Sequence, residues 1–569
     1  MILRNSMFKY IVLLGTGFIA LPSYGQETSA RDTTATPATM EEVEVIRDYR
    51  PILADAVKIR QSPDMSNMRR YQPELEYDII DKRLNMPSGM RPLRIQQMPT
   101  ERPEQMYPNY VKAGVGNYNS YLGELYINTA EDAYIQAGGY IKHLSQKGDL
   151  PQQKYAEQQI GIFGKSILDN ITLNGALGYN RYGTTFYGQV EGAEYLNPEP
   201  QDQVLNDINF SGELYNNYDP EDHDISYSVK ADAYLFSDKY SAKENAVALA
   251  AYFNKAINAF NIGANVSADF TSVKALDYSL KNNIARLNPY IRFQGKGYKL
   301  TLGINFVSEF GDSSRTNLIP KADLEFDVVP EYASIFAGIT GDVNKTSLRS
   351  MAGDNPYLNE NLEIRNQLDL MHIFGGIKGN VGSTLGYKAQ VFYKEVEDMP
   401  LYMNNGKNPS RFDLVYLEAG GDKNTVVGFQ GEINIRVSET VALGGLLNIN
   451  EYNFTDDQQA WFLPKIRLAA DTRINISEKL LLNGSLLFNG ESAAKTYAYT
   501  STATDISLLS PEIVDVPAFL DVNAGAEYRI NKQVGIYIQA NNLLGKTYER
   551  YLYYPRLGLN VFGGVNFSF

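Results

Sequence analysis

From residue 109 onward, apolar and polar residues alternate with a period of two. In the stretch "KADLEFDV" (321–328) every second residue is apolar and the residues between them are charged. The stretches "GEINIRVS" (431–438) and "IRLAADTRINIS" (466–477) repeat the pattern. Alternation over about ten residues is typical of strands that face lipid on one side and water on the other. The pattern therefore predicts an all-β, transmembrane, antiparallel β-barrel over residues 109–569.

A soluble β-sandwich also alternates, so strand length has to separate the two folds. Strands in soluble proteins are usually about five or six residues long, whereas the alternating stretches here run to ten or more. Many of their apolar positions hold Ala or Gly, as in "YIQAGGYIK" (134–142), where a packed core would hold larger side chains. Both features favour the barrel.

Short turns such as "LDN", "GKG" and "NKQ" alternate along the chain with longer polar loops. In bacterial outer-membrane barrels the short turns lie on the periplasmic side, and the strand number is even. A simple count of apolar segments gives an odd number, about 23. The stretch "FDLVYLEAGGDKNTVVGFQGEINIRV" (412–437), taken as one long irregular strand, restores parity. The corrected prediction is about 22 strands.

Two segments precede the predicted barrel. Residues 1–25 combine Arg4 and Lys9, an apolar run over 11–21, and the small residues Ser23 and Gly25 before a cleavage point. This order is that of a secretory signal peptide, so we expect export of the mature chain.

Residues 26–108 hold nine prolines and no sustained period, which excludes long helices and central strands. They also hold seven of the 13 methionines, and Met packs well into irregular gaps. We expect an extended periplasmic or lumen-associated segment. Two alternatives stay open: the segment lies against the barrel interior or a partner, or it is disordered.

Composition excludes several classes of function. The chain has no cysteine, hence no disulfide, thiolate metal site or lipid-anchored cysteine. Its net charge of −14, with no basic cluster, disfavours nucleic acid as a partner. His143, His223 and His372 share no local spacing, and no nucleophile is placed beside a base. We therefore expect neither an enzyme nor a metal or other cofactor.

The tyrosine-rich stretches "YERYLYY" (548–554) and "KTYAYTST" (495–502) have two interpretations. They form either aromatic ligand loops or part of the aromatic girdle at the membrane interface, and the girdle is the commoner use of tyrosine in barrels. The single Trp disfavours loops specialised for stacking on carbohydrate.

The last predicted hairpin carries a family resemblance. It has an Asn-Leu-Leu turn with Lys and Tyr, a Tyr-Pro loop, and a Gly-rich final strand that ends in Phe. This arrangement resembles TonB-dependent outer-membrane receptors, and the resemblance implies a 22-stranded barrel in the outer membrane. The residues that carry it are Asn542, Leu543, Leu544, Lys546, Tyr548, Tyr554, Pro555 and Gly558.

The N-terminal part departs from that family. Such receptors carry a plug domain of more than a hundred residues before the barrel, whereas here residues 26–108 stand in its place without the plug's motifs. The sequence therefore looks like a receptor-type barrel without its plug. A lumen this wide needs a filling, for which there are three candidates: residues 26–108, outer loops folded inward, or a partner protein.

Two short motifs suggest partners. The stretch "EEVEVI" (41–46) resembles a TonB box, in which Glu42, Val43, Glu44, Val45 and Ile46 would add a strand to the coupling protein TonB. Its alternative is an acidic patch in a linker.

The second motif is the final strand, "GLNVFGGVNFSF" (558–569). Val565, Phe567 and Phe569 lie on its apolar face, and we expect this strand to pair with the first so that no edge is left free. The ending resembles the C-terminal signal that the barrel-assembly machinery reads.

These features together predict an outer-membrane barrel that acts in transport across the outer membrane. The alternative is a structural or accessory subunit of a larger outer-membrane complex with no transport activity of its own. The expected partners are outer-membrane lipids, the barrel-assembly machinery, and either TonB or a periplasmic or surface lipoprotein.

Overall fold

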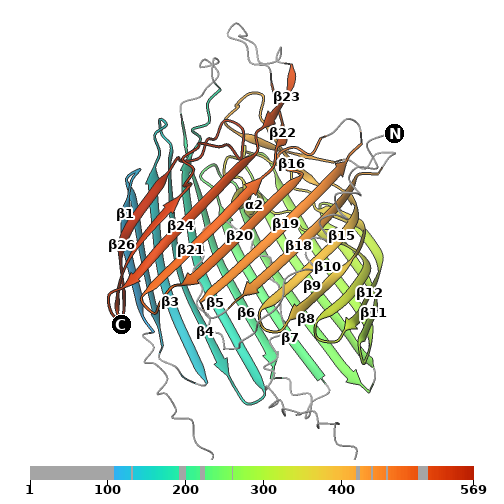
Figure 1. The fold of residues 1–569 in the computed structure, drawn as a ribbon. Coiled ribbons are helices and arrows are strands. Elements are labelled where there is room, and N and C mark those ends of the chain that lie inside the picture. The colour runs from blue at the N-terminus through green and yellow to red at the C-terminus, as the bar shows by residue number, and fades with distance from the viewer. Residues whose placement is uncertain are drawn as a thin grey trace, which may run out of the picture. The chain divides into compact units, whose positions relative to one another are not determined.

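A computed structural model describes residues 108–129, 132, 134–190, 200–217, 225–258, 260–417, 423–437, 440–455, 459–497 and 510–569. Its main element is one 22-stranded sheet in which each strand pairs antiparallel with the next and the last pairs with the first (Figure 1). The predicted closed barrel is thus confirmed. Its strands are β1 (Tyr110–Gly116), β2 (Ser120–Asn128), β3 (Ile135–Lys147), β4 (Lys154–Ile167), β5 (Ile171–Thr185), β6 (Asp202–Asn216), β7 (Ile225–Ser237), β8 (Lys243–Ile257), β9 (Phe260–Lys274), β10 (Ser279–Gly295), β11 (Tyr298–Gly311), β12 (Arg315–Val329), β13 (Ala333–Asn344), β14 (Gln367–Val381), β15 (Leu385–Glu397), β18 (Thr425–Arg436), β19 (Val441–Asn453), β20 (Ile466–Asn475), β21 (Leu480–Asn489), β24 (Phe519–Arg529), β25 (Val534–Asn541) and β26 (Asn560–Ser568).

The barrel closes between β1 and β26. Their register runs from Tyr110 opposite Ser568 to Gly116 opposite Phe562. Beyond the last ladder pair, the amide of Phe569 donates to the carbonyl of Asn109 at 3.0 Å, and the Asn109 amide donates back at 3.1 Å. Every edge is therefore paired, as a sheet in lipid requires.

In the residues that the structure describes, two short hairpins and one helix lie outside the ring of strands. The hairpins are β16 (Pro400–Asn404) with β17 (Phe412–Tyr416), and β22 (Ser492–Tyr497) with β23 (Pro511–Val516); α2 spans Leu348–Asp354. The prediction of one long strand over 412–437 is wrong, because β17 pairs with β16 whereas β18 belongs to the barrel. The total of 22 nevertheless holds, since the extra strand lies outside the ring.

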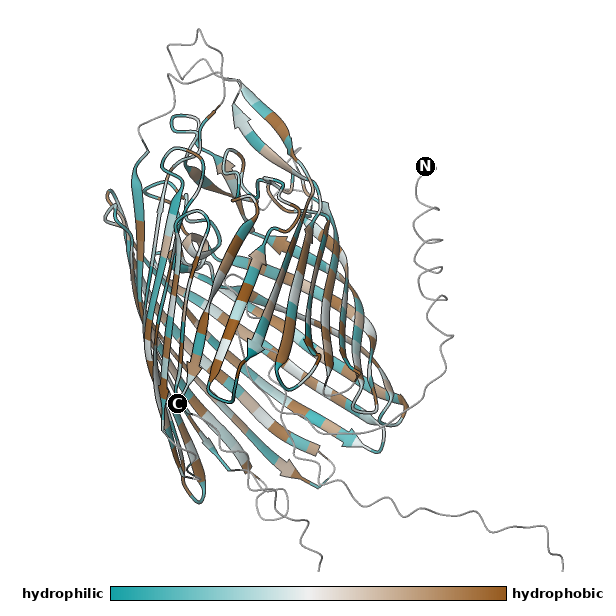
Figure 2. Ribbon diagram, turned by 60° about the vertical axis from the view of Figure 1, so that its left-hand side comes forward, coloured by the Kyte–Doolittle hydropathy of each residue, from teal (hydrophilic) through white to brown (hydrophobic). Residues whose placement is uncertain are grey.

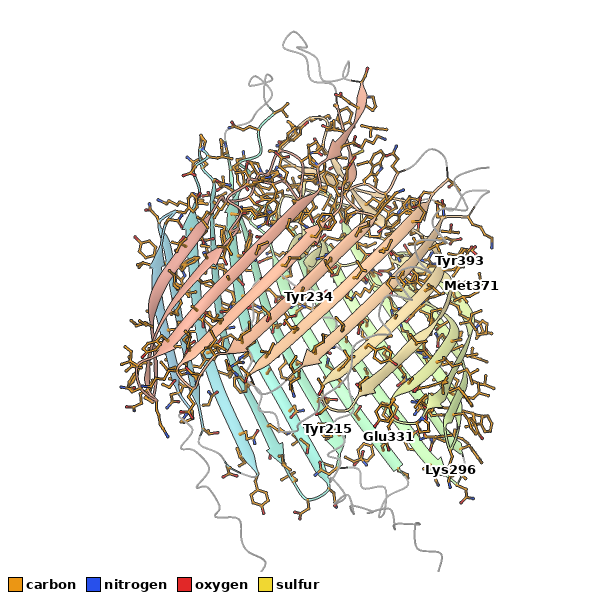
Figure 3. The ribbon with its side chains drawn as sticks, in the orientation of Figure 1. Tyr215, Tyr234, Lys296, Glu331, Met371 and Tyr393 are labelled. Carbon is orange, nitrogen blue, oxygen red and sulfur yellow. The ribbon has the colours of Figure 1, made fainter. Side chains whose placement is uncertain are left out.

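Connections differ in length between the two ends of the barrel. At one end lie short turns such as 168–170, 296–297 and 382–384, together with both ends of the barrel chain; we call this the short-turn rim. The opposite end carries the long connections, which include α2 and both hairpins. Figure 3 shows Lys296 and Glu331 at the short-turn rim, while side chains crowd the opposite end.

The two faces of the wall follow the alternation in the sequence, which Figure 2 shows as hydrophobic and hydrophilic residues in turn along the strands. On β12 the outward residues Leu324, Phe326 and Val328 are 48%, 49% and 55% exposed. The alternate residues Asp323 and Glu325 lie on the inner face, where each forms an ion pair with a lysine. Exposed tyrosines gather near the short-turn rim, as an aromatic girdle would: Tyr134, Tyr227, Tyr298, Tyr332 and Tyr528. In the described part of the chain no helix is long and apolar enough to cross a membrane.

Candidate functional site

The long connections fold inward and share one apolar core across the mouth of the barrel. Loops that leave the ring at β5, β13, β15, β19, β21 and β25 all contribute to it. Because these strands stand on different sides of the ring, their loops can meet only over the lumen. We call this assembly the cap. The buried residues of the core that the cap forms with the ends of wall strands β6, β7, β9, β15 and β18 are Phe186, Tyr187, Leu205, Phe236, Ala242, Val273, Leu348, Ala352, Tyr357, Leu358, Leu362, Ile364, Val396, Leu401, Phe412, Leu417, Val426, Trp461, Phe462, Ala494, Val516, Tyr551, Leu552 and Tyr554.

Tyr554 lies at the centre of the cap. Its ring stacks on that of Tyr357 with centroids 3.5 Å apart and planes 17° apart, and it meets Tyr187 edge-on at 5.0 Å. The Tyr554 hydroxyl donates to the carbonyl of Ser410 in the β16–β17 hairpin. One side chain thereby joins the loops after β5, β13, β15 and β25, so the cap is a packed structure with few alternative arrangements.

The interpretation of residues 548–554 as an interfacial girdle is wrong. Tyr551 and Tyr554 are 4% and 2% exposed and belong to the cap. Tyr548 stacks on Phe519 at 4.1 Å and donates to Asp521 at 2.8 Å. The alternative of an exposed ligand loop does not describe them either. A tyrosine-rich loop has the same composition in all three settings, and only its contacts with distant loops separate them.

Two acidic side chains of the wall attach the cap through α2. The buried carboxylate of Glu244 on β8 accepts from the amide of Leu348 and from the hydroxyl of Tyr234, both at 2.7 Å. The guanidinium of Arg349 pairs with Asp207 on β6 at 2.7 Å. The Arg349 side chain stays 39% exposed, so water screens its pair with Asp207, whereas loss of the buried Glu244 acceptor leaves donors without a partner at a cost of about 1–3 kcal/mol.

A further ionic contact holds the β16–β17 hairpin. The Arg411 guanidinium is buried, pairs with Glu360 at 2.7 Å and donates to the side-chain oxygen of Gln201 at 3.0 Å. It also lies 4.5 Å above the ring of Phe186. The hairpin is therefore joined to the loop after β5 and to the loop after α2.

Two carboxyl groups in the loops have perturbed acidity. Burial raises the pKa of the Asp238 carboxyl, although the amides of Tyr240 and Ala242 donate to it at 2.9 and 2.8 Å. Burial likewise raises the pKa of the Glu549 carboxyl, which accepts from the Tyr553 amide at 2.8 Å. Both groups lie at the end of the barrel that the cap covers.

The lumen between the cap and the short-turn rim is lined by charged side chains. Lys230 pairs with Asp232 at 3.4 Å, and Lys378 pairs with Glu325 at 2.8 Å. The side chains of Lys230 and Asp232 each stay 41% exposed, so water reaches them. The wall is thus a polar surface, and the cap closes the space that it encloses at one end.

The predicted site residues fall into two groups. Val565, Phe567 and Phe569 point outward and are 55%, 39% and 44% exposed. The TonB-box-like residues 42–46, the signal peptide and residues 26–107 lie outside the described residues, as does His223. In the described part no group of three or more His, Cys, Asp or Glu residues is arranged to hold a metal ion.

The attachment residues of the cap were missed by sequence reasoning. Glu244 and Asp207 read as ordinary polar positions at the ends of alternating strands, and no local pattern separates them from solvated neighbours. Only their contact partners distinguish these two side chains from solvated ones, and each partner lies more than a hundred residues away in the sequence.

Comparison with known proteins shows the fold. No protein-family model matches the chain, and no curated protein does. Among solved structures, the pyoverdine outer membrane receptor FpvA from Pseudomonas aeruginosa PAO1 is 12% identical, with a TM-score of 0.61 over 82% of this chain and 79% of that one. The ferric-catecholate import receptor Fiu from E. coli K12 is 9% identical, with a TM-score of 0.59 over 81% and 82% of the two chains.

The FrpB iron transporter from Neisseria meningitidis is a third neighbour, 9% identical, with a TM-score of 0.60 over 82% of each chain. The three neighbours are a pyoverdine receptor, a ferric-catecholate import receptor and an iron transporter, and at these identities the likeness shows a shared fold. The barrel of this chain therefore has the receptor fold that its last hairpin resembles.

Proposed function

We propose that this protein is an outer-membrane barrel that acts in transport and that its cap is the gate. One observation carries the proposal: a packed cap, attached to the wall by the Arg349–Asp207 ion pair and by hydrogen bonds to Glu244, covers a solvated and charged lumen in a receptor-type barrel. A 22-stranded barrel is wide enough to leave a passage unless something fills it. Loops folded inward were one of three candidate fillings, and the cap favours that candidate at this end.

We further propose that TonB supplies the energy for opening and that it acts through residues 42–46. The role of the segment that contains these residues is part of the same proposal. The outward Val565, Phe567 and Phe569 are proposed as the signal for the barrel-assembly machinery. Outer-membrane lipids would then cover the outward apolar face. The resemblance of the last hairpin and the shared receptor fold both support these proposals.

The second candidate function is an accessory barrel in a larger envelope complex. The size of the cap core favours it, because a mouth closed by so many buried side chains suits a protein through which nothing passes. Its expected partner is a periplasmic or surface lipoprotein.

Single-channel recording in planar bilayers separates the two. We expect the parent protein to conduct little and the double variant D207N/E244Q to open frequently, because it loses both acidic attachments of α2. The matched control is K230Q/D232N, which removes a charge pair of the lumen wall that touches no part of the cap, and it should stay closed.

If D207N/E244Q conducts no more than the parent while it remains folded, the cap is not a gate and the accessory function is favoured. Deletion of residues 42–46 tests the coupling separately. It should stop energised uptake in cells and leave the conductance of the purified protein unchanged.

A further inference from the structure

The lumen wall contains a recess between the cap and the short-turn rim. It has a volume of about 270 Å³ and is lined by residues of β8 to β12. Its origin is local. Pro289 has no amide hydrogen to donate, and the β10–β11 ladder skips from Leu287 opposite Phe306 to Tyr290 opposite Gly303. A proline inside a sheet interrupts the ladder in this way.

An aromatic ring forms the floor of this recess. Tyr290 is 8% exposed and lies over Gly263 of the neighbouring strand, where a Cβ atom would come within 2.3 Å of the ring. Its hydroxyl donates to the side-chain oxygen of Asn254 at 3.1 Å. The guanidinium of Arg292 lies 5.1 Å from the ring centroid, a cation–π distance that orients the side chain. Glycine at position 263 is thus what lets the ring lie flat.

Three groups in the recess lack the partners that they would normally have. Arg292 donates to the hydroxyl of Thr301 at 3.3 Å but forms no ion pair with any described residue. Asn305 is only 5% exposed; its amide nitrogen donates to the carbonyl of Gly341 at 2.8 Å, while its Oδ1 accepts nothing. The Oδ1 of Asn288 is buried and unpaired as well. A buried acceptor without a donor costs about 1–3 kcal/mol.

We propose that this recess binds a polyhydroxylated carboxylate of monosaccharide size, that is, a sugar acid. Arg292 pairs with the carboxylate, because a guanidinium presents two parallel N–H donors to it. Hydroxyl groups of the ligand donate to the unpaired oxygens of Asn288 and Asn305. A simple anion satisfies only the first group, and a neutral sugar satisfies only the other two.

Charge and size agree with this ligand class. Three cations line the recess against two carboxylates, and both carboxylates are paired, Asp323 with Lys321 at 3.8 Å and Glu325 with Lys378 at 2.8 Å. The volume is several times the roughly 30 Å³ that one water molecule occupies in the liquid. Recognition through polar groups also fits a chain with a single Trp, since it does not require indole stacking.

This inference names a substrate class for the proposed transport function. Only the passage of the ligand through the barrel depends on that function. Binding itself is a property of the purified barrel in detergent. Loss of transport with intact binding would overturn the proposed function alone, whereas loss of binding overturns the recess alone.

Titration calorimetry with glucuronate, glucose and acetate tests the proposal. Glucuronate should bind at least tenfold more tightly than either of the other two. R292Q should weaken glucuronate at least tenfold, and R292K should recover part of that loss because it restores the charge without the paired donors. K230Q, on the lumen wall at β7, is the matched control and should bind as the parent does.

N305L provides the second line of test. It should weaken glucuronate about tenfold and leave acetate unchanged, since only the hydroxylated ligand uses the Asn305 oxygen. Several results would overturn the proposal: acetate or glucose as tight as glucuronate, a dipeptide carboxylate as tight as glucuronate, parent-like affinity in R292Q, or no binding of glucuronate at all. Heat-modifiable migration on gels establishes that each variant is a folded barrel.

Discussion

Truncation of Phe412 should open the cap without unfolding the barrel. Phe412 is fully buried, and its ring lies 5.5 Å from Phe462, 5.6 Å from Tyr551 and 6.1 Å from Tyr554. Replacement of a buried Phe by Ala costs about 3–5 kcal/mol, through lost burial and the cavity left behind. The barrel ladders do not include β17, so this cost falls on the closed state of the cap.

The absence of cysteine provides the assay. A single A494C substitution puts a thiol at a position of the cap core that is 0% exposed, and a maleimide reaches it only when the cap opens. When opening and closing are fast, the labelling rate follows the open population. A loss of 3–5 kcal/mol corresponds to about two to four powers of ten in that population.

F412A should therefore label at least a hundredfold faster than the parent. The control is F163A on β4, where the truncated ring is 44% exposed and lies outside the cap, and labelling should change little. Equal labelling of F412A and the parent would refute the idea that the cap core holds the mouth closed. Labelling accompanied by loss of the folded gel band would refute the independence of cap and barrel.

Three further predictions follow from the seam, the loop carboxyls and the C-terminus. G564V should block barrel closure, because a Cβ there would lie 2.1 Å from the Ala113 carbonyl oxygen, whereas G563V, with its nearest atom at 3.9 Å, should close normally; the folded fraction on gels compares them. Asp238 and Glu549 have raised pKa values in the folded protein, so the stability that they contribute is fully present below the ordinary carboxyl pKa and is lost as pH rises through the folded pKa. Labelling of the A494C thiol, corrected for the reactivity of a free thiol, should therefore slow on acidification in the parent and slow less in D238N/E549Q. The opposite order would contradict the burial argument. Deletion of Phe569, which exchanges two hydrogen bonds with Asn109, should lower the membrane-inserted amount more than deletion of residues 26–28, and equal insertion of the two would count against an assembly signal.

The wall of the barrel could be predicted because the sequence patterns that specify it involve only neighbouring residues. Each strand shows its lipid face by alternation, and short turns mark one end, so the strand number and the closure by the last strand follow from neighbouring residues. Even the error over residues 412–437 did not change the total. Alternation says that Phe412–Tyr416 is extended, but it does not say which strand is its partner.

The cap could not be predicted because its contacts join residues far apart in the sequence. The amide of Leu348 reaches Glu244 across 104 positions, and the hydroxyl of Tyr554 reaches Ser410 across 144. Loops with many polar residues read as solvated from composition alone. Their buried aromatic residues become a core only when these connections meet over the mouth.

The positions of the cap and the recess restrict where the energy for opening can come from. A ligand shifts a conformational equilibrium only by its differential affinity for the two states. The recess is formed by β8 to β12 and includes no residue of the cap core, so a ligand bound to Arg292 contacts the same groups whether the cap is open or closed. We therefore expect that occupancy of the recess does not by itself open the mouth. To move the cap from 1% to 99% open requires about 5.5 kcal/mol of differential binding, and that energy has to enter through groups that touch the cap itself or through coupling from the periplasmic side. Recess binding should consequently be unaffected by F412A, while gate opening should be unaffected by R292Q, and the two sites should behave as independent stages of one passage.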